Sequence, residues 1–235
     1  VNLTGRVDTT SGYSYSFFCF EERPLAQVIG ERLQIPVTLE NDSRAMTYGE
    51  YMSGIVKGEK NVIFINVNWG LGSGLILDGK RYYGKSGYSG EFGHISAFDN
   101  EILCGCGKKG CLETEASGFA MQRILTERYE QGSSTILSDV MKEKGEASLS
   151  DFVDAVMKED VLAIEIVEHI GLNLGRWVAG LINIFNPELV VIGGPLSLTQ
   201  DYIRLPIKSA MKKYSLNLVN QDTELVISKL GERAG

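Results

Sequence analysis

Residues 91–113 read Glu-Phe-Gly-His-Ile-Ser-Ala-Phe-Asp-Asn-Glu-Ile-Leu-Cys-Gly-Cys-Gly-Lys-Lys-Gly-Cys-Leu-Glu, which gathers one histidine and three cysteines in a short stretch. The four candidate metal ligands are His94, Cys104, Cys106 and Cys111. One imidazole and three thiols form the ligand set of tetrahedral structural zinc, and the interspersed glycines let the backbone turn tightly enough for the sulfurs to converge. Because four protein ligands leave no open position, the pattern indicates a structural rather than a hydrolytic zinc. The alternative is three unrelated thiols in a surface loop.

Composition sets broad limits on the function. The 235 residues are 43% hydrophobic and 23% charged, as expected of a globular chain with one large domain or two small ones. With 23 basic and 30 acidic residues the formal net charge is −7, which argues against a nucleic-acid surface on this stretch. No apolar run reaches the roughly 18 residues of a membrane span, and no secretory signal opens the chain. We therefore expect a cytoplasmic protein without a membrane partner, in which clustered cysteines favour metal binding over disulfides.

Local patterns predict the elements of the N-terminal quarter. Gly5–Gly12 is typical of a strand end followed by a turn. Pro24–Leu33 has helical apolar spacing, with proline at its first position. Ile35–Leu39 reads as a short β-branched strand, and Asp42-Ser43 offers the N-cap of a helix that runs to about residue 54.

The next segment predicts a meander of strands. Asn61–Val67 has the composition of a buried strand and leads through a glycine loop, Gly70-Leu-Gly-Ser-Gly74, into Leu75–Leu77. Asp78-Gly79 is a hairpin signal, and Arg81–Tyr83 is the returning strand. This order differs from the strand, glycine loop and helix of a Rossmann unit.

The rest of the chain alternates helices with strands. Helices are predicted over 116–128, 149–157, 160–185 and 203–214, and strands over 189–192 and 224–228. Together with the meander, this alternation indicates a mixed-sheet α/β protein.

Three acidic residues lie beside unusual backbone and are candidates for ligand binding. Asp42 follows Asn41 at a strand-to-helix junction, whereas Glu91 and Glu113 border the segment with the metal ligands. Carboxylates placed with an amide and the imidazole of His94 provide the bidentate hydrogen bonds that sugar hydroxyls need. Taken singly, Asp42 would be a helix N-cap and the two glutamates would be surface charges.

The glycines and the other polar residues carry weaker signals. The glycines that permit close approach of a phosphate are Gly70, Gly72, Gly193 and Gly194. The same residues could equally mark a bulge, a tight turn or a closely packed helix. We expect Glu115 to be a solvent or helix-start charge, and His169 and Cys19 to be packing residues.

These motifs together resemble one family. Asn41-Asp42, Glu91-Phe-Gly-His94, the cysteine segment ending at Glu113, and Val190-Val-Ile-Gly-Gly194 occur in the order seen in the ROK family of repressors, open reading frames and kinases. Gly5-Arg-Val-Asp8 is similar to an upstream segment of that family. The resemblance covers nearly the whole chain, and the pairing of ExGH with CxCGxxGCxE is highly specific.

The resemblance implies an actin-like ATPase (ribonuclease H-like) sugar kinase fold, α/β with a mixed sheet, flanking helices and a zinc loop at 94–113. It implies that residues 1–41 are a remnant of the N-terminal lobe, that residues 42–235 form the C-terminal lobe, and that the chain is a fragment. A sugar lies between the lobes of such proteins. The residues that match its contacts are Asn41, Asp42, Glu91, His94 and Glu113. The residues that match the zinc ligands are His94, Cys104, Cys106 and Cys111.

Two departures from the kinase pattern bear on function. In kinase members the residue matching Asp42 is the general base, and glycines matching Gly70, Gly72, Gly193 and Gly194 flank the nucleotide. The DxGxT phosphate loop of the kinases would lie upstream of Val1. The kinase glycine loop usually reads Gly-Thr-Gly, and this chain has Asn68-Trp69-Gly70 at that place. The sugar motif is therefore intact, while the nucleotide motif carries a bulky indole.

We accordingly expect the sugar-sensing effector domain of a ROK-type transcriptional regulator. It would bind a hexose or N-acetylhexosamine, form a homo-oligomer such as a dimer, and contact DNA only through a domain outside these residues. The alternative is an ATP-dependent sugar kinase of hexokinase or glucokinase type, with Asp42 as general base and Mg-ATP as cofactor. A third possibility is a structural domain with a vestigial site.

Overall fold

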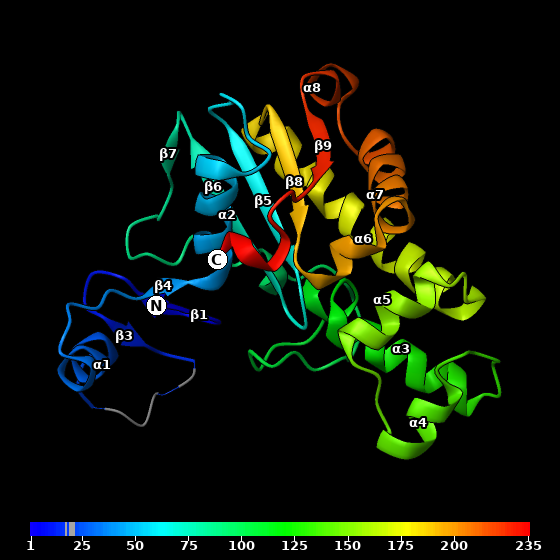
Figure 1. The fold of residues 1–235 in the computed structure, drawn as a ribbon. Coiled ribbons are helices and arrows are strands. Elements are labelled where there is room, and N and C mark those ends of the chain that lie inside the picture. Colours follow the sequence, from blue (N-terminus) through cyan, green and yellow to red (C-terminus); the bar gives the residue numbers. More distant parts are fainter. Residues whose placement is uncertain (17, 19–21) are drawn as a thin grey trace.

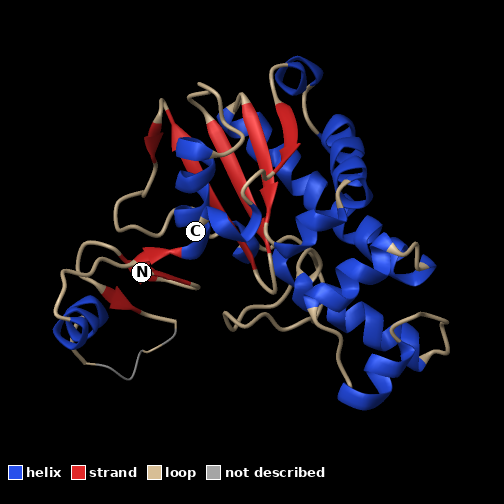
Figure 2. Ribbon diagram, in the orientation of Figure 1, coloured by secondary structure: helices blue, strands red, loops and turns tan. Residues whose placement is uncertain are grey.

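A five-stranded mixed sheet forms the centre of the computed structural model, which describes residues 1–16, 18 and 22–235 (Figure 1; Figure 2). The strands are β5 (Val62–Val67), β6 (Leu71–Leu77), β7 (Lys80–Arg81), β8 (Leu189–Gly193) and β9 (Glu224–Ile227). They lie in the order β7-β6-β5-β8-β9. The pairs β5–β6 and β6–β7 are antiparallel, whereas β5–β8 and β8–β9 are parallel. The predicted mixed-sheet α/β class is confirmed.

Strand β5 is buried along its whole length, and every residue of it except Asn66 is apolar, because both faces of the sheet are covered. Val62 and Phe64 pack in one core cluster with Met46 of helix α2 (Asp42–Ser53). Ile63 and Ile65 pack in a larger cluster with the helices of the opposite face. A strand that is buried on both sides has no reason to alternate apolar with polar residues, which explains the continuous apolar run at 62–65.

The helices of the opposite face come from the C-terminal half of the chain (Figure 1). They are α3 (Gly118–Glu130), α4 (Ser138–Lys144), α5 (Leu149–Met157), α6 (Val161–Phe185) and α7 (Asp201–Tyr214), followed by the short α8 (Asn217–Gln221). The long helix α6 begins at Asp160, whose side chain accepts a hydrogen bond from the Ala163 N–H, and ends at Asn186 in a left-handed conformation. Among the described residues no helix combines the length and apolarity that crossing a bilayer requires.

The first 41 residues form small elements beside the main sheet (Figure 2). Strand β1 (Asn2–Leu3) pairs in parallel with β4 (Glu40–Asn41), and β2 (Val7–Asp8) pairs antiparallel with β3 (Tyr13–Ser14). Helix α1 spans Leu25–Leu33. The division into lobes at residue 41 stays a prediction.

Two sequence predictions of local structure are wrong. Ile35–Leu39 forms no strand, because Pro36 lacks a backbone donor and the pairing with β1 begins only at Glu40. The expected loop over 70–74 is instead a tight turn at Gly70 followed by strand β6, which already begins at Leu71. The returning strand is also shorter than predicted and ends at Arg81. The prediction for Cys19 lies outside the described residues.

Candidate functional site

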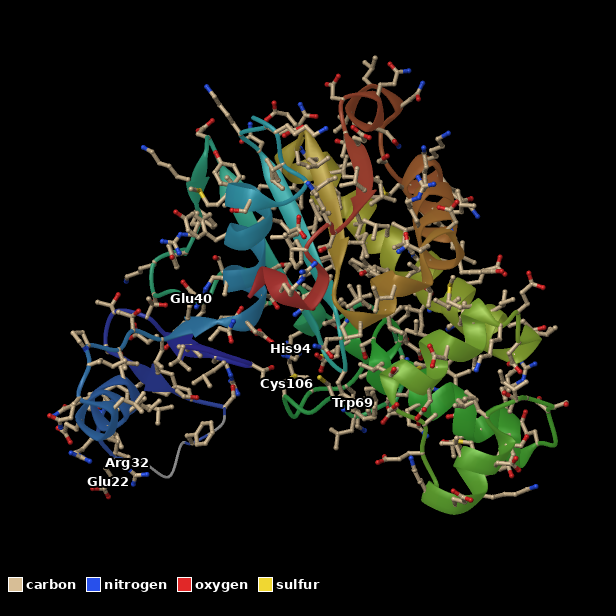
Figure 3. All side chains as sticks on the ribbon, in the orientation of Figure 1. Glu22, Arg32, Glu40, Trp69, His94 and Cys106 are labelled. Carbon is tan, nitrogen blue, oxygen red and sulfur yellow. The ribbon has the colours of Figure 1, made fainter. Side chains whose placement is uncertain are left out.

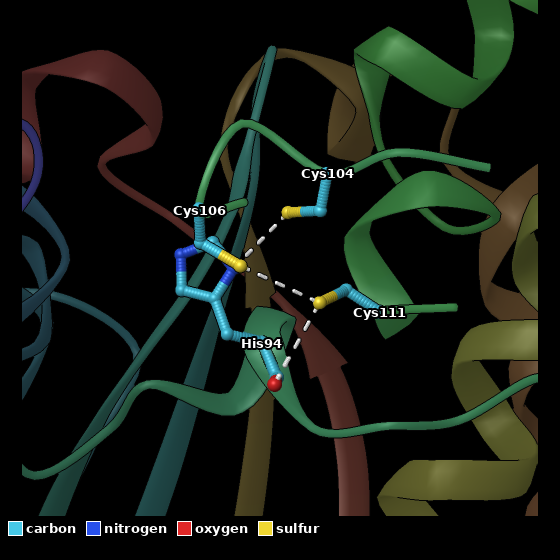
Figure 4. Close-up of side chains that lie close together, drawn as sticks. All are labelled: His94, Cys104, Cys106 and Cys111. Atoms are coloured by element: carbon cyan, nitrogen blue, oxygen red, sulfur yellow. Dashed lines mark hydrogen bonds between the residues drawn. The ribbon is translucent and has the colours of Figure 1, made fainter. Parts of the chain in front are cut away.

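The predicted ligand set converges on one point (Figure 4). One ligand atom from each of His94, Cys104, Cys106 and Cys111 lies within 4.8 Å of the others. The Sγ atoms of Cys106 and Cys111 are 3.6 Å apart, and Cys104 Sγ lies 3.5 Å from His94 Nδ1. Sulfurs bound to one tetrahedral zinc at about 2.3 Å would be about 3.8 Å apart, so the spacing fits such an ion. The four residues could therefore hold a metal.

Electrostatics also favour a cation in this cluster. Cys104 and Cys111 are buried, and burial raises the pKa of the Cys104 thiol, with the nearby Glu113 carboxylate adding to the shift. Three thiols beside a carboxylate can lose their protons together only if a positive charge replaces them, and metal binding provides that charge.

The carboxylates of Glu91 and Glu113 flank His94, which Figure 3 labels. His94 Nε2 lies 3.8 Å from Glu91 Oε2, and His94 Nδ1 lies 4.0 Å from Glu113 Oε1. Glu113 Oε1 is also 3.4 Å from Cys104 Sγ, while its Oε2 accepts the Leu71 N–H at 2.9 Å. The Nδ1 edge of the ring therefore faces the thiols, and the Nε2 edge faces Glu91. Glu113 ties the metal-ligand loop to the start of β6.

At the start of α2, the N-cap is Asn41 and not Asp42 as the sequence suggested. Asn41 Oδ1 accepts the Arg44 N–H at 3.1 Å, and Asn41 Nδ2 donates to the Gly5 carbonyl at 2.9 Å and to Asp42 Oδ1 at 3.0 Å. Asp42 is the first helical residue, and its Oδ1 accepts the Ser43 N–H at 2.7 Å. Burial raises the pKa of Asp42, although hydrogen bonds from Ser43 oppose the shift. The Asn41 amide thus holds the candidate carboxylate in place.

Sequence reasoning missed a buried ion pair on either side of Asn41-Asp42. Arg44, 6% exposed, donates from Nε to Glu40 Oε1 at 2.7 Å, and Tyr83 Oη donates to Glu40 Oε2 at 3.0 Å. Burial opposes the effect, but the bonds from Arg44 and from the Asn41 N–H hold the pKa of Glu40 below its ordinary value. The sequence did carry a signal for this ion pair, because Glu40 and Arg44 stand four positions apart on either side of Asn41-Asp42.

The glycines predicted near the nucleotide are each explained by close packing. A Cβ at Gly72 would lie 2.2 Å from Ser43 Oγ, and one at Gly70 would lie 2.8 Å from Glu113 Oε2. A Cβ at Gly193 would lie 2.2 Å from the Phe64 ring, and Gly194 has a φ of +80°. Their contact with a nucleotide stays a prediction.

Of the two roles expected for Glu115, a solvent charge or a helix-start charge, the solvent role is wrong. The Glu115 side chain is 15% exposed and accepts a hydrogen bond from Arg123 Nη2 at 2.7 Å, with His169 Nε2 at 3.7 Å. Burial opposes the shift, but His169 and Arg123 hold the pKa of Glu115 below its ordinary value. His169 is half exposed and its Nε2 lies 2.9 Å from Asn173 Nδ2, so the packing role predicted for it is wrong. This cluster joins the end of the metal-ligand loop to α3 and α6.

A groove of about 830 Å³ borders Trp69, whose side chain is 47% exposed. Its wall includes Lys144, residues 146–151, residues 153–154, Pro195 and Leu198. The charged residues of this wall are Lys144, Glu146, Asp151 and Asp154. Acids outnumber bases here, so the groove is unfavourable to polyanions.

Comparisons with known proteins agree with the geometry. The ROK family model matches residues 2–235. A glucokinase of Halalkalibacterium halodurans is 33% identical over 234 residues, covering 98% of this chain and 71% of that protein. The DNA-binding transcriptional repressor Mlc of Escherichia coli is 29% identical over 224 residues, covering 94% of this chain and 54% of the repressor.

Two solved structures also share the fold. A ROK family transcriptional regulator, a homologue of E. coli Mlc, has a TM-score of 0.87 at 32% identity and covers 99% of this chain, which spans 58% of that regulator. A ROK family glucokinase from Streptomyces griseus, in complex with glucose and AMPPNP, has a TM-score of 0.83 at 28% identity. The match covers 91% of this chain and 70% of the glucokinase. The predicted actin-like ATPase fold of the sugar kinases is confirmed.

Proposed function

Because this chain belongs to the ROK family, we propose that it is the sugar-sensing effector domain of a ROK-type transcriptional regulator. The ligand is a hexose or N-acetylhexosamine bound between two lobes, 1–41 and 42–235. The residues that contact it are Asn41, Asp42, Glu91, His94 and Glu113. DNA is bound by a domain outside these residues, and the protein acts in the cytoplasm as a homo-oligomer.

One observation carries the choice of a regulator over a kinase: three of the four backbone N–H groups of the turn at 68–71, those of Asn68, Trp69 and Leu71, already have acceptors. The Asn68 N–H donates to the Gly70 carbonyl at 3.0 Å, and the Trp69 N–H donates to Asn68 Oδ1 at 2.7 Å. The Leu71 N–H donates to Glu113. A loop that cradles phosphate needs free N–H groups that point at the anion. The acidic groove beside Trp69 supports the same conclusion, since a triphosphate is repelled there.

The metal in this proposal is a structural zinc held by His94, Cys104, Cys106 and Cys111. Bound zinc supplies no reaction chemistry with four protein ligands and instead fixes the fold of the loop. Because the Nδ1 edge of His94 faces the thiols, the Nε2 edge is left toward Glu91 and the sugar.

A sugar kinase is the second candidate, favoured by the raised pKa of Asp42. A carboxylate with that shift is a better general base toward a sugar hydroxyl that attacks Mg-ATP. The similarity to a glucokinase, of which the chain covers 71%, supports this alternative equally.

Calorimetry on the full-length protein separates the two functions. We expect one member of a panel of hexoses and N-acetylhexosamines to bind, while Mg-ATP binds no tighter than about millimolar. Asp42→Ala and Glu91→Ala should each weaken sugar binding roughly ten- to a hundredfold, on the scale of a lost charge-assisted hydrogen bond. Glu115→Ala is the matched control, because that carboxylate faces Arg123 and His169.

Each contrary result has a distinct meaning. Micromolar ATP binding with phosphate transfer to the sugar would establish the kinase. Unchanged sugar affinity in both the Asp42→Ala and the Glu91→Ala variants would refute the site.

A further inference from the structure

We infer that Arg44 is a positioning residue for the sugar site, holding the hairpin β2–β3 and the loop 84–90 against the first turn of α2. This inference rests on the proposed function, since the site that it positions is the proposed sugar site. It differs from that proposal in assigning a role to a residue that does not touch the ligand.

The guanidinium of Arg44 reaches three separate segments. Its Nε donates to Glu40 at 2.7 Å, its Nη2 donates to the Val7 carbonyl at 3.2 Å, and its Nη1 donates to the Gly87 carbonyl. Val7 belongs to β2, and Gly87 lies at the middle of the loop that leads into Glu91. Only a planar fork of several donors can satisfy three acceptors in these directions, and a lysine ammonium has a different geometry.

Glu40 completes the cluster from the other side. Its carboxylate also accepts the Asn41 N–H at 2.9 Å, the Thr9 hydroxyl at 3.2 Å and the Tyr83 hydroxyl at 3.0 Å. Thr9 follows β2, and Tyr83 immediately precedes the loop 84–90. Figure 3 shows the position of Glu40. The pair therefore fastens together the elements from which Asn41, Asp42 and Glu91 project.

The loop depends on such a fastening because its own backbone is weakly constrained. Gly84, Gly87 and Gly90 all have positive φ, and a Cβ at Gly87 would meet nothing within 4 Å. Its far end is held where Ser73 Oγ donates to the Gly90 carbonyl at 3.0 Å. Ser89 also bonds to the carbonyls of Tyr82 and Tyr83, which closes the loop on the residues before it. Arg44 supplies the bond that ties the middle of the loop to α2.

A double variant distinguishes positioning from simple structural support. Arg44→Met alone leaves the largely buried Glu40 with only the more distant guanidinium of Arg81, 3.8 Å away, and this loss destabilises a protein whatever its function. Arg44→Met combined with Glu40→Gln removes both charges, so the melting temperature should stay within about 4 °C of the unsubstituted protein. Arg44→Lys keeps the ion pair but loses the fork. The control is Arg204→Met, which removes a surface pair with Asp201 on α7.

Two measurements on the full-length protein give the outcome. In the double variant and in Arg44→Lys we expect sugar affinity to fall at least about tenfold. We also expect the amides of residues 84–91 to exchange hydrogen at least about threefold faster, with the metal content unchanged. Arg204→Met should change neither quantity.

The inference and the proposed function fail separately. If no sugar binds the unsubstituted protein, the proposed function is wrong, and hydrogen exchange still decides whether Arg44 holds the loop. If sugar binds and either variant keeps full affinity, or if exchange in the loop is unchanged, the inference about Arg44 is overturned.

Discussion

Gly74→Ala should disturb the sugar site although Gly74 lies on the sheet and outside the predicted set of sugar contacts. A Cβ at Gly74 would lie 2.8 Å from Thr47 Cβ and 2.0 Å from Thr47 Oγ1. Thr47 is buried on α2, and its Cβ is fixed to the helix backbone, so no rotamer change relieves the contact. Carbon atoms pack at about 3.5–4.0 Å, so the helix has to retreat by roughly 1 Å.

The size of the effect follows from that displacement. Overpacking of a closed core costs about 1–3 kcal/mol of unfolding free energy. Asp42 begins the same helix, and a shift of about 1 Å at a functional group should weaken sugar binding roughly ten- to a hundredfold. Gly72→Ala should have a smaller effect, because the atom it meets most closely is Ser43 Oγ, which can rotate away.

Urea unfolding and sugar calorimetry on the full-length protein test the argument. Gly180→Ala on α6 is the control, since a Cβ there meets nothing within 4 Å and should stabilise the helix by about 0.5–1 kcal/mol. Adding Thr47→Gly to Gly74→Ala removes the Thr47 Cβ itself and should recover at least about 0.5 kcal/mol relative to additivity. Strict additivity, or a Gly74→Ala protein with the stability and sugar affinity of the parent, would refute the packing explanation. Loss of ATP binding alone would assign the glycines to a nucleotide.

Two further predictions concern the metal and Asp42. Cys106→Ser should reduce the metal content from about one ion per chain and lower the unfolding free energy by roughly 3 kcal/mol or more, because metal binding is coupled to folding. Elemental analysis with urea unfolding measures both, and metal-free parent protein of unchanged stability would contradict it. Asp42→Asn should unfold at higher urea than the parent at pH 7, since burial raises the pKa of Asp42 and its charged form costs stability above that pKa. The difference should shrink as the pH falls and vanish below about 3.9, the unfolded value; equal midpoints at pH 7 would count against it.

The metal cluster could be predicted from sequence because its chemistry is local. Three of its ligands fall within eight positions, and no other common side chains combine so directly into a tetrahedral site. The buried strand β5 was also predictable, since the unbroken apolar run of its first four residues needs cover on both faces.

What the sequence did not reveal depends on contacts between distant segments. The β-branched run at 35–39 predicted a strand, but a strand also needs a partner, and β1 pairs only with residues 40–41. Glu115 was expected to be a solvent or helix-start charge, yet α6 passes beside it and brings His169 within 3.7 Å. Pairs such as Gly74 and Thr47 belong to different elements, so nothing in the local pattern distinguishes a packing glycine from one that approaches phosphate.

A chain of contacts around β6 connects the metal cluster to Asp42. Cys104 lies beside Glu113, and Glu113 accepts the backbone N–H of Leu71 at the first position of β6. The next residue of that strand, Gly72, packs against Ser43, whose N–H donates to the Asp42 carboxylate. Each step is a direct contact in a closely packed region, and packed regions transmit a displacement rather than absorb it. A metal that touches no sugar atom can therefore set the position of Asp42 through the same strand whose glycines seat α2.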